Sequence, residues 1–332
     1  MRRSRVRRAI ARAFVLGCVL GCALAPAAGA QAQGFPTKPV TIICDAPAGS
    51  TPDVDTRFIA EGLGKIWGQQ VVTANHPGAS GSIGARAASE APADGYTLYM
   101  PSLATFISQP GAAPNLPLQL PRDFTAIGFT AANPMFFAVS PSLGISTLPE
   151  LIARAKQRPG EISYATTGIG RVTHLTGELL QMRAEIKLLL VPYTGGPARA
   201  VSDVTNGRVD FIIEGYSGIA GAIKSGLLKP IAVASPERLS DFPDVPTVAE
   251  TIPGFAASGW QVMVAPVGTP DTIIQKVSVD LRRVVDDPDI KQKLGRLGSY
   301  TRHMNPTEAL AYVQGEQATW RPVLEKIAAK SN

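Results

Sequence analysis

Cysteine is the scarcest informative residue in this 332-residue sequence, with only three copies at positions 18, 22 and 44. Cys18 and Cys22 lie in an N-terminal apolar run that we expect to be removed. Cys44 then stands alone and can form no disulfide within the chain. The count also excludes a cysteine-based metal cluster, and we interpret Cys44 as a small residue buried in an apolar strand.

Motifs for metals, nucleotides and nucleophilic catalysis are missing as well. The three histidines, His76, His174 and His303, have no H-E-x-x-H spacing, so we expect no metal site. Residues 168–173 contain only the first two glycines of a dinucleotide fingerprint. The sequence has no P-loop lysine and no G-x-S-x-G turn. We therefore expect no cofactor and no catalytic residue, and a hydrolase cleft assembled only in the tertiary structure is the weaker alternative.

Excess positive charge is confined to the N-terminus. Residues 1–32 contain six arginines and no acidic residue, so 26 basic and 26 acidic residues remain in the rest of the chain. Arginines followed by a short apolar run and Ala30-Gln31-Ala32 are typical of a cleavable signal peptide. We predict export to the periplasm, with lipid attachment at Cys18 or Cys22 as the weaker alternative. The balanced remainder gives no argument for a nucleic-acid partner.

Apolar strands alternate with helical patterns along most of the exported part. Strands are expected at 40–44, 70–74 and 96–100, and again at 124–129, 135–139, 162–165, 187–191, 209–213 and 230–234. Helices are expected at 53–63, 85–90, 148–157, 172–184, 197–205, 219–224, 272–285 and 306–328. Such alternation predicts parallel βαβ units in an α/β fold. It occurs twice, which predicts two lobes around a ligand cleft.

Two glycine-rich turns carry the functional hypothesis. Residues 164–175, YATTGIGRVTHL, and residues 40–53, VTIICDAPAGSTPD, each run from a strand through a turn into a helix. The first N–H groups of a helix have no partner within it, and the helix dipole adds positive charge there. Both turns can therefore hold an oxyanion.

Several side chains near these turns and near later strand ends are candidates for ligand contact. Arg171 offers a planar donor fork for a carboxylate, with solvent exposure as the alternative. His174 can instead cap or pack, and Ser50 and Thr51 can instead cap their helix. Loops at strand ends often carry function, and aromatic side chains there could form the walls of the cleft. The complete candidate set from the residues is Ser50, Thr51, Phe106, Thr166, Thr167, Arg171, His174, Tyr193 and Tyr216. Trp260 is expected at a hinge or in the core.

The order and content of several strings resemble the periplasmic receptors of tripartite tricarboxylate transporters, often called Bug-type receptors. The strings are FPTKP at 35–39, NHPGA at 75–79, APADGYTL at 91–98, GIGRVTHL at 168–175, VPY at 191–193, DVPTVAE at 244–250 and APVGTP at 265–270. The resemblance covers nearly all of the exported chain. The combination of DGYTL and DVPTxxE in this order is specific.

This resemblance implies a two-lobed periplasmic binding protein type II fold that closes over a small carboxylate, without enzymatic activity. We predict residues 1–32 as signal peptide, 33–137 and 259–332 as the first lobe, and 138–258 as the second. By position, the resemblance assigns carboxylate contacts to Ala48, Ser50, Thr51, Thr166, Thr167 and Gly170. It also implies a membrane permease as partner, and we expect a monomer.

Two departures from the family pattern suggest which ligand is bound. Asp45 stands where an apolar residue or proline is usual, so the first turn could be reshaped. Arg171 is a cation where a small residue is common, which suggests a second negative group and hence a dicarboxylate. Phe106, Tyr193 and Tyr216 would suit an aromatic spacer such as terephthalate, while citrate-like and C4 dicarboxylates are the rivals. A periplasmic adaptor that presents its ligand to a sensor protein is the alternative function.

Overall fold

The computed structural model describes residues 34–107 and 119–331 of the chain. The elements described below belong to one compact unit that begins at Pro36. The predicted signal peptide lies outside the described residues. Within the described residues, no helix is both long and apolar enough to cross a membrane.

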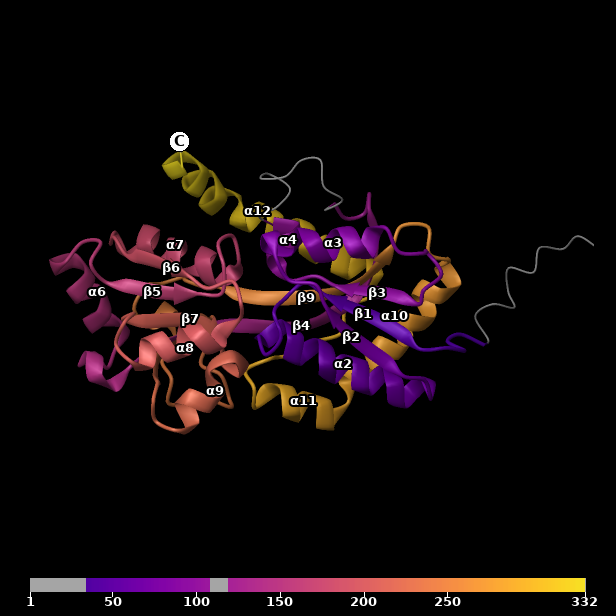
Figure 1. The fold of residues 1–332 in the computed structure, drawn as a ribbon, viewed down its shortest axis with the longest axis horizontal. Coiled ribbons are helices and arrows are strands. Elements are labelled where there is room, and N and C mark those ends of the chain that lie inside the picture. The colour runs from indigo at the N-terminus through magenta and orange to yellow at the C-terminus, as the bar shows by residue number, and fades with distance from the viewer. Residues whose placement is uncertain (1–33, 108–118, 332) are drawn as a thin grey trace, which may run out of the picture. The chain divides into compact units, whose positions relative to one another are not determined.

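The α/β architecture expected from the alternation is confirmed (Figure 1). The strands are β1 (Val40–Cys44), β2 (Val71–Asn75), β3 (Thr97–Met100), β4 (Phe124–Val139), β5 (Ser163–Thr166), β6 (Leu189–Pro192), β7 (Phe211–Gly215), β8 (Lys229–Val233) and β9 (Ser258–Pro266). Their order is β2-β1-β3-β9-β4-β7-β5-β6, with β8 also paired to β4. β1 pairs in parallel with β2 and β3, and β5 pairs in parallel with β6 and β7.

The helices up to residue 184 are α2 (Thr51–Trp67), α3 (Ser82–Ser89), α4 (Leu103–Ile107), α6 (Leu148–Gln157) and α7 (Val172–Ala184). Those that follow are α8 (Pro197–Thr205), α9 (Tyr216–Lys224), α10 (Asp271–Asp286), α11 (Pro288–Gly295) and α12 (Pro306–Ser331). Short 3₁₀ turns occupy Ala79–Gly81, Pro141–Leu143 and Val248–Glu250. We call β1–β3 with α2–α4 the first lobe, and β5–β8 with α6–α9 the second lobe.

β4 is one long strand where the sequence predicted two strands separated by Asn133-Pro134. Its first part pairs with β9 down to Pro134, and its last part pairs with β7 and β8 from Met135 onward. Proline cannot donate to a sheet ladder. Pro134 sits where the pairing changes partners, so the missing N–H does not break the strand. Met135 resumes the ladder by donating to the carbonyl of Ala257.

β4 and the segment leading into β9 thus connect the two lobes, as Figure 1 shows. A continuous apolar core follows them and includes Phe124, Phe137, Phe211 and Trp260. α12 packs on β4, α4 and α7, so it contacts both lobes. The lobe boundaries at 137/138 and 258/259 stay a prediction. The first of them lies close to Pro134, where β4 changes its partner strands.

Candidate functional site

The two strand–turn–helix segments meet at one cavity between the lobes. α2 begins at Thr51 behind β1, and α7 begins at Val172 behind β5. Parallel strands in each lobe bring the starts of the following helices to the same edge of the sheet. The cavity has a volume of ≈ 40 Å³. Its polar and aromatic lining residues are Ser50, Thr51, Ser102, Asn133, Thr167, Arg171, Thr173, Glu214 and Trp260.

In the first lobe the turn before α2 is held by its own hydroxyl. The Ser50 Oγ donates to the carbonyl of Pro47 at 2.6 Å and makes no side-chain cap bond to the helix. Capping by Ser50, one of the two sequence interpretations, is therefore wrong for this structure. Asp53 accepts from the N–H of Gly49 at 2.9 Å and so closes the turn. The Ser50 hydroxyl and the start of α2 both border the cavity.

In the second lobe the turn before α7 depends on glycine. Gly168 and Gly170 have φ values of 134° and 76°, which side chains with a Cβ rarely adopt. The Thr167 N–H donates to the Thr173 Oγ1 at 3.2 Å, which fixes the turn against the first turn of α7. The fold thus presents Thr167 and Thr173 together on the cavity wall.

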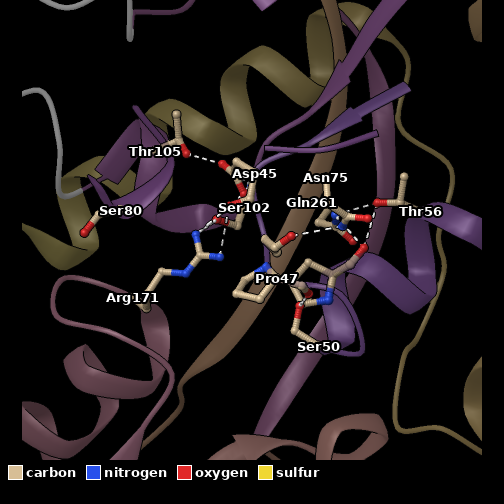
Figure 2. A network of polar contacts seen from close by, with 12 residues as sticks. Asp45, Pro47, Ser50, Thr56, Asn75, Ser80, Ser102, Thr105, Arg171 and Gln261 are labelled. Carbon is tan, nitrogen blue, oxygen red and sulfur yellow. Dashed lines mark hydrogen bonds and ion pairs between the residues drawn. The ribbon is translucent and has the colours of Figure 1, made fainter. Parts of the chain in front are cut away.

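Arg171 spans the space between the lobes (Figure 2). Its Nη1 donates to the Ser102 Oγ at 2.9 Å, and its Nη2 donates to the backbone carbonyl of Asp45 at 3.3 Å. The same Nη1 lies 3.6 Å from the Asp45 carboxylate. The sequence hypothesis treated Arg171 as a cation in need of an anionic ligand group. This part of the hypothesis needs correction, because Asp45 already supplies a negative charge.

Asp45 is buried, and its carboxylate is well supplied with donors. It accepts from the Tyr99 hydroxyl at 3.0 Å, from the Ser102 N–H at 3.2 Å and from the Thr105 hydroxyl. Burial and the Asp45 charge raise the pKa of the Tyr99 phenol well above its usual value, so the phenol stays a donor. Asp45, the unusual residue of the first turn, therefore holds the Arg171 guanidinium of the second lobe from the first lobe.

Two further hydrogen bonds join the lobes directly. The Ser80 Oγ donates to the carbonyl of Ile169 at 2.6 Å, and the Ser217 Oγ donates to the Thr51 Oγ1 at 2.7 Å. Ala79 and Ser80 adopt φ values of 43° and 50°, so this contact is made by a strained turn. A second hollow of ≈ 220 Å³ borders this turn and shares Pro47, Thr167 and Arg171 with the first cavity. The structure therefore has the lobes in direct contact around both hollows.

Among the described residues that line the smaller cavity, two side chains are ionisable, Arg171 and Glu214. The Glu214 side chain is 3% exposed, at the end of β7. Its Oε1 accepts from the N–H of Gly215 at 2.9 Å, whereas Oε2 has no hydrogen-bond partner among the described residues. Burial raises the pKa of Glu214 to about 7, against the opposing effects of the Gly215 N–H, the Thr167 hydroxyl and Arg171.

Several sequence candidates lie away from this cavity. Phe106 is 0% exposed and packs edge-on against Phe124, so it cannot form the predicted ring wall. Tyr216 packs on Phe136 and Phe242, with ring centroids at 5.3 and 4.3 Å. These aromatic rings complete the core, where burial of apolar area favours them.

The other displaced candidates make local backbone or surface contacts. The Tyr193 hydroxyl donates to Asp203 at 2.7 Å, and Ala48 is exposed beside Gly196. The Gly170 N–H donates to the Nδ1 of His174, so the imidazole supports the turn as the local interpretation proposed. Thr166 is fully buried in β5. None of these five, Ala48, Thr166, Gly170, His174 and Tyr193, lines the smaller cavity, and ligand contact by them stays untested.

The structure adds lining residues that sequence analysis missed. Trp260 borders the cavity while its Nε1 donates to Glu316 at 2.8 Å, so its ring is fixed in place. Asn133 comes from the middle of β4 and donates to Asp55 at 2.7 Å and to Ser299 at 2.7 Å. Glu214 lies between the strand predicted at 209–213 and the helix predicted at 219–224, and no sequence pattern identifies it as a cavity residue. Among the described residues, no group of three or more His, Cys, Asp or Glu is arranged to hold a metal ion.

Comparisons with known proteins identify what the chain is similar to. The family model described as "Tripartite tricarboxylate transporter family receptor" matches residues 56–329. Protein BugT of Bordetella pertussis (strain Tohama I) is 33% identical over 310 residues, which are 92% of this chain and 94% of that protein.

Two solved structures match over nearly their whole length. R. palustris Rpa4515 with adipate gives a TM-score of 0.84 at 29% identity, covering 88% of this chain and 97% of that one. MatC (Rpa3494) from Rhodopseudomonas palustris with bound malate gives a TM-score of 0.78 at 27% identity, covering 87% of this chain and 100% of that one. These likenesses confirm the two-lobed α/β fold that the sequence predicted.

Proposed function

The chain belongs to the tripartite tricarboxylate transporter family of receptors, and from this premise we propose that it captures a small organic carboxylate in the cavity between its lobes. Members of this family are solute-binding receptors and not enzymes. We propose further that the ligand is delivered to a membrane permease. The proposed place of action is the periplasm, with the protein as a monomer.

One observation carries the proposal: two helix starts from different lobes border the same cavity. Ser50 and Thr51 come from the first lobe, and Thr167 and Thr173 come from the second. N–H groups and hydroxyls at helix starts are suited to carboxylate oxygens. Because the two starts lie on different lobes, a ligand that contacts both also holds the lobes together.

Magnitudes show what this arrangement must supply. Micromolar affinity requires about 8 kcal/mol of net binding free energy. One helix start contributes roughly 0.3–1 kcal/mol and at most about 2 kcal/mol, so two of them are insufficient. Charge-assisted hydrogen bonds contribute about 1.5–3 kcal/mol each. Three or four such bonds from the lining hydroxyls, N–H groups and Arg171 would supply the remainder.

We propose an aliphatic dicarboxylate as the ligand class. The relatives whose structures contain adipate or malate support it. The terephthalate hypothesis depended on Phe106, Tyr193 and Tyr216, which lie away from the cavity.

The experiment is a thermal-shift screen of the exported chain against matched aliphatic and aromatic mono- and dicarboxylates. Ligands that bind only the folded state raise the melting temperature by mass action. We expect C4 to C6 dicarboxylates to give the largest shifts, in agreement with the compounds named for the relatives. No shift with any organic acid would contradict the receptor proposal. Co-purification from membranes would distinguish a permease partner from the sensor protein of the alternative.

Arg171→Ala tests how a second carboxylate is held. We expect calorimetry to show that the fold-decrease in affinity is about ten times greater for a dicarboxylate than for the matching monocarboxylate, which corresponds to about 1.4 kcal/mol. The excess is modest because Asp45 already shares the charge of Arg171. Arg171→Lys keeps a cation and serves as the control. Equal losses for both ligands would remove Arg171 from this role.

A further inference from the structure

Glu214 stands out because its position conflicts with a receptor for anions. An ionised carboxylate on the wall of a carboxylate-binding cavity would repel the ligand. The side chain is nevertheless buried at the end of β7 and borders the cavity. Its presence there requires either a proton on Glu214 or a donor on the ligand.

We propose that Glu214 is a specificity-determining residue that binds the ligand as a neutral carboxylic acid and donates its proton in a hydrogen bond to a ligand carboxylate. The proposal rests on the proposed carboxylate-receptor function. When the ligand meets an ionised Glu214, the carboxylate takes a proton from a buffer acid, which is left as its conjugate base, and no bond of the ligand changes. The ligand class is therefore one with an acceptor oxygen, and not a donor, next to Glu214.

The hydrogen bonds around Glu214 leave one position for such a contact. Oε1 is occupied by the Gly215 N–H, and Oε2 has no partner among the described residues although it is buried. A buried carboxyl oxygen without a partner is unfavourable, because it has lost its hydrogen bonds to water. Gly218 of α9 lies so close that a Cβ there would approach the Glu214 Cγ at 2.9 Å, so the side chain has little freedom to move away. A ligand in the adjoining cavity is the natural partner for Oε2.

The electrostatic surroundings of Glu214 allow it to exist in either form. α9 contributes Gly218, β4 places Phe136 opposite it, and the turn after β5 contributes the Thr167 hydroxyl. Among the described residues, Arg171 at the start of α7 is the charged group that acts on it. Its carboxyl pKa of about 7 means that both forms are populated near neutrality before the ligand arrives. A bound anion favours the protonated form further, because it adds a like charge next to the carboxylate.

The test is calorimetry of the exported chain with adipate, or with the dicarboxylate that gives the largest thermal shift, in buffers with different ionisation enthalpies. We expect uptake of about half a proton per ligand near pH 7 and close to one near pH 8. Affinity should fall by up to tenfold per pH unit above about pH 7. In Glu214→Gln, whose amide remains a donor, we expect retained binding, no proton uptake and little pH dependence between about pH 7 and pH 8.

Each other outcome overturns the inference without overturning the receptor function. Wild-type binding with no proton uptake contradicts it, and this measurement does not depend on any variant folding. Loss of binding in a folded Glu214→Gln protein indicates that an ionised Glu214 accepts a donor from the ligand. Proton uptake that persists in Glu214→Gln but disappears in Asp55→Asn assigns it to the other buried carboxyl. Failure of all carboxylates to bind at any pH contradicts the proposed function itself.

Discussion

Gly215→Ala is expected to prevent the lobes from reaching the contact seen here while leaving each lobe folded. Gly215 ends β7 with φ −62° and ψ 145°, which alanine adopts without strain. A Cβ at this position would lie 2.2 Å from the Thr51 Oγ1 and 2.8 Å from the Thr51 Cβ. Thr51 belongs to the first lobe and Gly215 to the second, so the overlap is relieved when the lobes separate.

The size of the effect follows from the contacts that separation removes. Relieving the overlap requires movement of about 1 Å at this point, because carbon atoms in contact are about 3.5–4.0 Å apart. The adjacent bond from the Ser217 Oγ to the Thr51 Oγ1, at 2.7 Å, would then be lost. One such bond contributes about 0.5–1.5 kcal/mol, and overpacking in a tight site costs about 1–3 kcal/mol. We expect ligand affinity to fall by roughly 10- to 100-fold, which is about 1.4–2.8 kcal/mol.

Calorimetric titration with the dicarboxylate identified in the screen is the assay. The matched control is Gly221→Ala in α9, where an added Cβ has no neighbour within 4 Å and should leave affinity unchanged. Thermal unfolding without ligand should differ little between Gly215→Ala and the wild type. Unchanged affinity in Gly215→Ala would refute the idea that lobe contact at Thr51 accompanies binding.

Two further predictions concern stability and lobe contact. Burial raises the pKa of Asp55 to about 7, against hydrogen bonds from Ser299 and Asn133, whereas an unfolded aspartate has a pKa of about 3.9. The folded state therefore keeps a proton that the unfolded state releases, and stability is lost as pH rises from about 4 to about 7. Asp55→Asn should remove this loss. The free energy of unfolding of the variant minus that of the wild type, measured in urea, should therefore rise by on the order of 2–4 kcal/mol between about pH 5 and about pH 8. A difference that stays constant across this range would contradict the assignment. Ser80→Ala removes the 2.6 Å hydrogen bond to the Ile169 carbonyl, a loss of about 0.5–1.5 kcal/mol, so we expect two- to tenfold weaker ligand binding by calorimetry. Ser89→Ala is the control, because the Ser89 hydroxyl donates within its own helix.

Local signals in the sequence predicted most of the fold. The helix predicted at 148–157 has the observed bounds of α6, and at its start the Thr147 hydroxyl accepts from the Glu150 N–H. Leu175 and Leu179 at helical spacing likewise placed α7 at its observed bounds. The strands predicted at 124–129 and 135–139 are one strand, β4, with Pro134 inside it. Only the pairing with two different partner strands explains why it is tolerated here.

The cavity was predicted less completely than the fold. The turns at Ser50 and Thr167 were found because glycine, hydroxyl residues and a helix start are adjacent in sequence. Trp260 and Asn133 come from strands that lie far from these turns in sequence, so no local pattern identifies them. The pairing of Arg171 with Asp45 joins residues 126 positions apart and changes the charge available to a ligand. Long-range pairing of this kind is decided by tertiary packing and not by local propensity.

A crystal structure of the exported chain with its tightest-binding dicarboxylate would show whether one ligand contacts both lobes. We predict carboxylate oxygens within about 2.7–3.2 Å of groups from both helix starts, including Ser50 or Thr51 in the first lobe and Thr167 or Thr173 in the second. We also predict one carboxylate oxygen within this distance of the Glu214 Oε2. A ligand bound to one lobe alone, or outside the cavity between Thr51 and Thr167, would contradict the account.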